Sequence, residues 1–255
     1  MLSLRAQFRA LRAAMTFLTR LPVGGYPFSA DELRRSSGYF PAVGCALGAM
    51  QAVLHTGLDW LLGPWSAALG TVAFAVWITG AFHEDGLADT ADALGGGYTK
   101  SRVLEILKDS RVGTFGAAAL CLSLLARVLA LAAAGPTAPA ALIVIEAVSR
   151  APPVIMLALI PYATRPEVAK SKDIAEGQFA QAAQAALTAA IVLIAAVVGG
   201  ALGPFVGCLL VGLAWVIASV AGRVFVRAVG GLTGDFLGAV QQLVALAMWI
   251  VWVRP

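Results

Sequence analysis

The sequence predicts an all-α membrane protein, a polytopic bundle of transmembrane helices. Of its 255 residues, 60% are apolar and only 13% are charged, whereas a soluble domain is about 45–50% apolar and about 25% charged. The mean hydropathy is +0.84. The apolar stretches run unbroken and lack the alternation of a lipid-spanning barrel. A soluble monomer and a disordered chain are therefore both excluded, and residues 1–255 are expected to form one domain.

The first expected element is an amphipathic helix within residues 1–24. Arg5, Arg9 and Arg12 recur at spacings of four and three, so they share one helical face, and Leu4 and Phe8 mark another. Such a helix lies on an anionic membrane surface and does not cross the bilayer. Residues 25–35 are polar and are expected to form a loop.

A transmembrane bundle is expected over residues 38–253. Crossing the hydrocarbon core takes roughly 20 helical residues, and about seven apolar segments approach that length, with six as the alternative count. These segments are 38–62, 65–82, 114–134, 139–161, 180–200, 204–226 and 236–253.

The basic residues predict the orientation of this bundle. Fifteen of the 18 Lys and Arg residues fall on one side, including Arg165, Lys170 and Lys172 between the fourth and fifth spans. The positive-inside rule makes that side cytoplasmic. The N-terminus and the charged loops are thus expected in the cytoplasm. Because orientation accounts for the positive charge, the lipid bilayer is the expected partner and no nucleic acid is indicated; a homo-oligomer is left open.

An acidic stretch follows the second predicted span. Asp85, Asp89 and Asp92 are spaced by four and three residues, so they stack on one face of a helix, and no Lys or Arg lies within the stretch. Carboxylates are hard ligands that suit Mg²⁺, which proteins usually hold together with substrate phosphates. We predict a metal site at these three residues, with Asp89 and Asp92 also as catalytic candidates. The alternative is a solvated acidic helix end.

A second polar stretch precedes the third span. Lys108 and Arg111 are catalytic candidates that would neutralise phosphate oxygens. Ser110, Gly113 and Thr114 would offer backbone or hydroxyl donors to an anion near a helix N-terminus. The alternative is an ordinary helix end with flanking positive charges.

Further candidates lie near the last span and inside the apolar segments. Asp235 follows a glycine-rich turn and is interpreted either as a helix cap or as a further metal or base carboxylate. Charges at the bilayer centre cost roughly 2.5–3.5 kcal/mol, so Arg127, Glu146 and Arg150 are expected to face the protein interior. Glu146 and Arg150 are four residues apart and can pair, or Arg150 can contact an anionic substrate.

Three of these stretches, residues 83–92, 108–116 and 233–239, together resemble the cobalamin synthase family (adenosylcobinamide-GDP ribazoletransferase). The resemblance implies an Mg²⁺-dependent integral transferase of the bacterial inner membrane. It would join α-ribazole, or its 5′-phosphate, to adenosylcobinamide-GDP and release GMP, completing the nucleotide loop of cobalamin. The chain departs from the family pattern at Ala93, where Gly is common, and at Ala245, where a Glu is frequent.

Two other functions are weighed against this one. A membrane phosphotransferase of the CDP-alcohol type also uses an Asp-rich helix end, but only the Asp85-Gly86 pair matches its motif. An ion-coupled transporter would use Arg127, Glu146 and Arg150 as its pathway. Because the carboxylates gather at one surface and not at mid-membrane, an enzyme is favoured.

Overall fold

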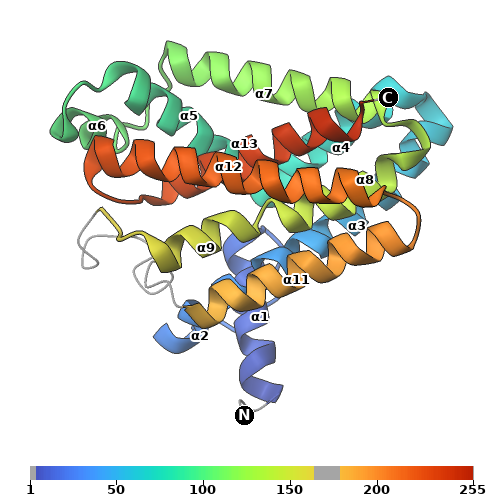
Figure 1. Cartoon of the computed structure of the whole chain (residues 1–255), viewed down its shortest axis with the longest axis horizontal. Helices are drawn as coiled ribbons and strands as arrows, with labels where there is room; N and C mark the ends of the chain where they lie inside the picture. The colour runs from blue at the N-terminus through green and yellow to red at the C-terminus, as the bar shows by residue number, and fades with distance from the viewer. Residues whose placement is uncertain (1–3, 164–178, 255) are drawn as a thin grey trace.

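The computed structural model describes residues 4–163 and 179–254, and these are helical apart from short connections (Figure 1). Helices α7, α12, α13, α9 and α11 run side by side in the view, and the short α1 stands across them. The helices are α1 (Leu4–Leu18), α2 (Ala30–Ser36), α3 (Phe40–Leu62), α4 (Pro64–Thr79), α5 (Phe82–Gly96), α6 (Lys100–Ile106), α7 (Thr114–Ala133), α8 (Ala138–Val148), α9 (Ala151–Leu159), α11 (Phe179–Val198), α12 (Pro204–Val229) and α13 (Gly234–Trp252). The all-α fold class is confirmed.

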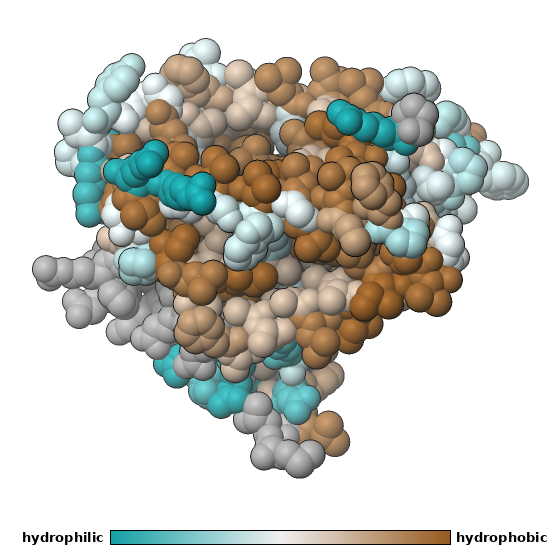
Figure 2. All heavy atoms as spheres, viewed as in Figure 1, coloured by the Kyte–Doolittle hydropathy of each residue, from teal (hydrophilic) through white to brown (hydrophobic). Residues whose placement is uncertain are grey.

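Six helical stretches within the described residues are long and apolar enough to cross a membrane, and a bent pair of helices brings the number to as many as seven. The six are 30–62, 114–133, 135–159, 179–198, 204–229 and 234–252. Figure 2 shows apolar side chains over the outward faces of α11 and α12. Large side chains such as Trp215 and Leu187 are exposed there, as expected of surfaces that face lipid. The basic residues Arg165, Lys170 and Lys172 lie outside the described residues.

The second predicted span, 65–82, is wrong as a single straight helix. Helix α4 ends at Thr79, and α5 then leaves at an angle of 88°. The cause is local: Gly80 and Ala81 both take left-handed backbone angles, with φ of 67° and 59°, and such residues stop a right-handed helix. Sixteen residues give α4 a length of only about 24 Å. The two helices therefore form at most one bent span, and its second half, α5, carries the acidic stretch.

The N-terminal segment differs from its predicted loop. Within residues 25–35, Ser29 and Glu32 form a reciprocal capping box that starts the helix α2. Glu32 also pairs with Arg9 of α1, which fixes α2 against α1. Helix α1 itself is confirmed, with Leu4 and Phe8 exposed on one side.

The predicted span 139–161 is broken into α8 and α9 by a turn at Ser149 and Arg150. Helix α8 packs closely on α3 because glycines of α3 face it. A Cβ on Gly48 would lie 2.5 Å from the carbonyl oxygen of Leu142. Small residues of this kind let membrane helices approach each other closely, so α3 and α8 form a tightly packed pair.

Candidate active site

The acidic face lies on α5, which packs between α13 and α7. Asp85 is exposed, Asp89 is half-buried and Asp92 is buried. The approach of α13 depends on Gly86, where a Cβ would lie only 2.8 Å from the backbone oxygen of Asp235. The start of α13 thus lies directly against the acidic helix, so the structure brings Asp235 to the predicted aspartate site.

Asp235 is not the cap of its helix. The N-cap of α13 is Thr233, whose hydroxyl accepts a hydrogen bond from the backbone N–H of Phe236 at 3.3 Å. Asp235 sits in the first turn, half-buried. The interpretation of Asp235 as a helix cap is therefore wrong. The other interpretation, that Asp235 is a further carboxylate of the site, stays a prediction.

Asp89 lies among the other carboxylates of this region. The charged groups that affect Asp89 are all acids, namely Asp85, Asp235 and Asp92. Like charges held this close disfavour full ionisation, and a cation relieves them. Carboxylate oxygens are the ligands Mg²⁺ prefers, so the donor chemistry fits that ion. Within the described residues, however, no three acidic, His or Cys side chains converge as a ready-made metal site, and Mg²⁺ binding stays a prediction.

Asp92 already has partners in the protein. Its two carboxylate oxygens accept the backbone N–H groups of Gly113 at 2.7 Å and Gly116 at 2.8 Å. Both N–H groups lie at the start of α7, where they have no carbonyl partner within the helix and where a negative charge is favourable. The N-terminus of α7 therefore binds a carboxylate of the protein itself, and the binding of a substrate anion there stays a prediction. Asp92 fastens α5 to α7, and the roles predicted for Asp92 in metal binding or catalysis stay predictions.

The loop between α6 and α7 borders this junction. Lys108, Ser110, Arg111 and Thr114 are all exposed. Arg111 forms a two-pronged pair with Asp109, with its Nη2 donating at 2.6 Å and its Nε at 3.0 Å. These hydrogen bonds lower the pKa of Asp109 to about 2. The contacts predicted between this loop and substrate phosphates stay predictions, and the loop lies at the α5–α7 junction, where such contacts would be needed.

A second polar cluster lies inside the bundle, at the start of α5. Glu84 and Arg127 of α7 form a buried ion pair at 2.7 Å, and Gln242 of α13 donates to the same Glu84 oxygen at 3.2 Å. Arg127 is the 14th residue of α7, or about 20 Å along it. The acidic helix therefore begins within the bundle. The sequence had suggested that it begins at the membrane surface, and this expectation is wrong.

Arg150 belongs to this interior cluster. Its Nη1 pairs with Glu146 at 2.5 Å, and the side chain is 3% exposed, so the predicted Glu146–Arg150 pair is confirmed. The cluster surrounds a cavity of about 10 Å³, room for roughly one water. The contact predicted between Arg150 and an anionic substrate stays a prediction. In the described part of the chain this cavity offers no open pathway of the kind a transporter needs.

Sequence reasoning gave no role to Glu84, Gln241 or Gln242. Gln241 donates to Ser149 at 2.9 Å across the break between α8 and α9, and Gln242 completes the Glu84 pair. One signal in the sequence could have found Glu84. A charge as deep in a span as Arg127 needs a partner, and Glu84 was the one acid of residues 83–92 without a predicted role.

Comparison with known proteins identifies the family of the chain. The cobalamin-5-phosphate synthase family matches residues 10–253. A relative from Leptothrix cholodnii, named adenosylcobinamide-GDP ribazoletransferase, is 38% identical, and the match covers 99% of this chain and 98% of the relative. Relatives of the same name from Ralstonia nicotianae and Vibrio cholerae are 39% and 33% identical, covering 99% and 97% of this chain and 97% and 94% of their own lengths. No solved structure matches the chain. Nearly the whole chain takes part in these matches, and it belongs to the cobalamin-5-phosphate synthase family.

Proposed function

We propose that this chain is a membrane-bound transferase that joins the phosphate of adenosylcobinamide-GDP to α-ribazole, or to α-ribazole 5′-phosphate, and releases GMP. The observation that carries the proposal is the meeting of three sequence motifs at one place. On the acidic helix α5, Gly86 lies against Asp235 at the start of α13, and Asp92 accepts a hydrogen bond from Gly113 at the start of α7. These segments are far apart in the sequence, and a solvated helix end would not need to bring them together.

The reaction requires a base that accepts one proton and groups that stabilise the negative charge on the phosphates. A ribose hydroxyl of the ribazole attacks the phosphorus attached to cobinamide, the bond from that phosphorus to the GMP oxygen breaks, and the hydroxyl proton passes to a carboxylate. Asp89 and Asp235 are the candidates for this base, because Asp92 already accepts two backbone hydrogen bonds. Bound Mg²⁺, with Asp85, Asp89 and Asp92 as predicted ligands, would neutralise phosphate oxygens.

Two cations of the α6–α7 loop have a place in this proposal. Lys108 and Arg111 are exposed beside the junction of α5 and α7 and would bind phosphate oxygens. Arg111 pairs with the Asp109 carboxylate in this structure, so it would leave that carboxylate in order to bind a phosphate. Both lie on the strongly basic side of the chain, which supports an active site on the cytoplasmic face of a bacterial inner membrane.

The test is GMP release by the purified chain in detergent. We expect GMP to form only when adenosylcobinamide-GDP and α-ribazole are both present, to stop when EDTA removes divalent ions, and to return with Mg²⁺. A reaction without α-ribazole is the control that separates transfer from hydrolysis. The same GMP yield with and without α-ribazole would contradict the proposal, as would full activity in EDTA.

A further inference from the structure

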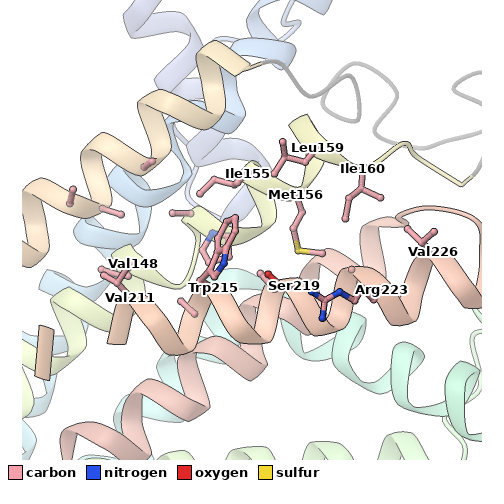
Figure 3. Close-up of a pocket in the computed structure, with 18 of the residues that line it drawn as sticks. Val148, Ile155, Met156, Leu159, Ile160, Val211, Trp215, Ser219, Arg223 and Val226 are labelled. Carbon is pink, nitrogen blue, oxygen red and sulfur yellow. The ribbon is translucent and has the colours of Figure 1, made fainter. Parts of the chain in front are cut away.

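A large cavity lies on the side of the bundle away from α5, which carries the aspartates, and from α7. It has a volume of about 610 Å³ and is bounded by α9, α11 and α12 (Figure 3). The wall is almost wholly aliphatic, and many of the side chains are small. Representative lining residues are Ile155 and Met156 of α9, Ala189 and Leu193 of α11, and Trp215 and Ala218 of α12. None of them takes part in the proposed transfer.

Positive charge is confined to one end of this cavity. Arg223 and Arg227 both line it, and they are four residues apart, so they share one face of α12. Figure 3 places Arg223 at the end opposite Val148 and Val211. Both arginines are exposed, and among the residues that the structure describes neither forms an ion pair. Two cations that form no ion pair with a described residue thus border an apolar groove.

The depth of the arginines matches a lipid headgroup. Helix α12 has 26 residues from Pro204, so Arg223 is its 20th residue and Arg227 its 24th. Because about 20 helical residues cross the hydrocarbon core, both guanidinium groups reach the headgroup level, while Trp215 and Ala218 stay at acyl-chain depth. The basic end is on the side assigned to the cytoplasm, whose leaflet carries anionic lipids.

We propose that this groove binds one anionic phospholipid, with an acyl chain along α12 and the phosphate on Arg223 and Arg227. The polar ribazole and nucleotide are poor matches for an aliphatic wall. A second copy of the chain is the other possible occupant, and the test below separates it from a lipid. The proposal does not rest on the transfer reaction and holds for any function of the bundle.

The experiment uses the full chain in phosphatidylcholine nanodiscs that contain increasing fractions of brominated phosphatidylglycerol. Bromine on the acyl chain quenches a tryptophan that it touches, and Trp215 reports on the groove. The difference between wild type and Trp215→Phe isolates that signal. The key variant is Arg223→Gln with Arg227→Gln. Its matched control, Arg5→Gln with Arg102→Gln, removes the same charge from exposed cytoplasmic arginines elsewhere.

We expect half-maximal quenching of Trp215 to need about twenty-five times more phosphatidylglycerol in the groove variant, since each arginine near an anionic surface contributes about fivefold in affinity. The control pair should stay within about twofold of wild type. A second variant, Ala218→Leu, narrows the groove without changing charge and should weaken quenching as well.

Three results would overturn the proposal. Equal quenching by brominated phosphatidylcholine and phosphatidylglycerol would mean that the groove has no headgroup preference. Protection of Trp215 by adenosylcobinamide would assign the groove to substrate. A change from dimer to monomer in the arginine variant, measured by native mass spectrometry, would assign it to a second copy.

Discussion

The buried pair between Glu84 and Arg127 gives the sharpest test of how the acidic helix is held. Both side chains are less than one tenth exposed, at 8% and 9%, so water screens the pair little. Replacing Arg127 by Met leaves the Glu84 carboxylate charged among apolar helices. We expect this single change to destabilise the fold strongly, and Glu84→Leu to do the same by stranding the arginine.

The expected magnitude follows from the burial. Removing one partner of a buried ion pair costs about 3–5 kcal/mol, because the other charge is left uncompensated. Replacing both by apolar residues of similar size is often close to neutral. The hydrogen bond from Gln242 is the smaller effect, since interhelical hydrogen bonds in membranes average about 0.6 kcal/mol. Glu84→Leu with Arg127→Met should therefore lose at least about 2 kcal/mol less than the sum of the singles.

The assay is reversible unfolding in mixed micelles by titration with sodium dodecyl sulfate, followed by tryptophan fluorescence for wild type, both singles and the double. The double-mutant cycle isolates the coupling between the two side chains. Additive losses would refute the reasoning, because they would mean that the two charges do not compensate each other in the folded protein.

Two further predictions concern packing and orientation. Gly86→Ala places a Cβ 2.8 Å from the Asp235 backbone and should reduce GMP release by at least about tenfold. Gly96→Ala is its matched control on the same helix, since a Cβ there would face α6, with Ile106 Cδ1 nearest at 3.6 Å, and it should stay within about threefold; equal losses would deny that the α5–α13 approach matters. Ser101→Cys in a variant without native cysteines should react with an impermeant thiol reagent only from the inner face, and labelling in intact cells would reverse the orientation.

Much of the fold follows from apolar periodicity, and the exceptions have local causes. The apolar runs predict the long helices because every backbone polar group must be satisfied within the bilayer. They do not predict the bend at Gly80 and Ala81, because alanine rarely adopts a positive φ. Nor do they predict helix α2, whose seven residues depend on the capping box of Ser29 and Glu32 rather than on hydrophobicity.

The site divides in the same way. Spacing alone places Asp85, Asp89 and Asp92 on one helical face, and the structure has them there. Spacing does not show which neighbours they meet: that Asp92 accepts hydrogen bonds from the start of α7 depends on packing between segments some 20 residues apart. The glycines after the motif also have a packing reason, because a Cβ on Gly95 would lie 2.6 Å from the ring of Phe115.

The central claim is that the acidic face of α5 and the start of α13 form one site, and a double-mutant cycle on Asp89 and Asp235 tests it most directly. GMP release, normalised to folded protein, is measured for Asp89→Asn, Asp235→Asn and the double. Residues that act as a unit give strongly non-additive losses, so each single should lose nearly all activity and the double should be little worse than the poorer single. Losses that multiply, or near-normal turnover by Asp235→Asn, would contradict the claim and leave α5 to act without α13.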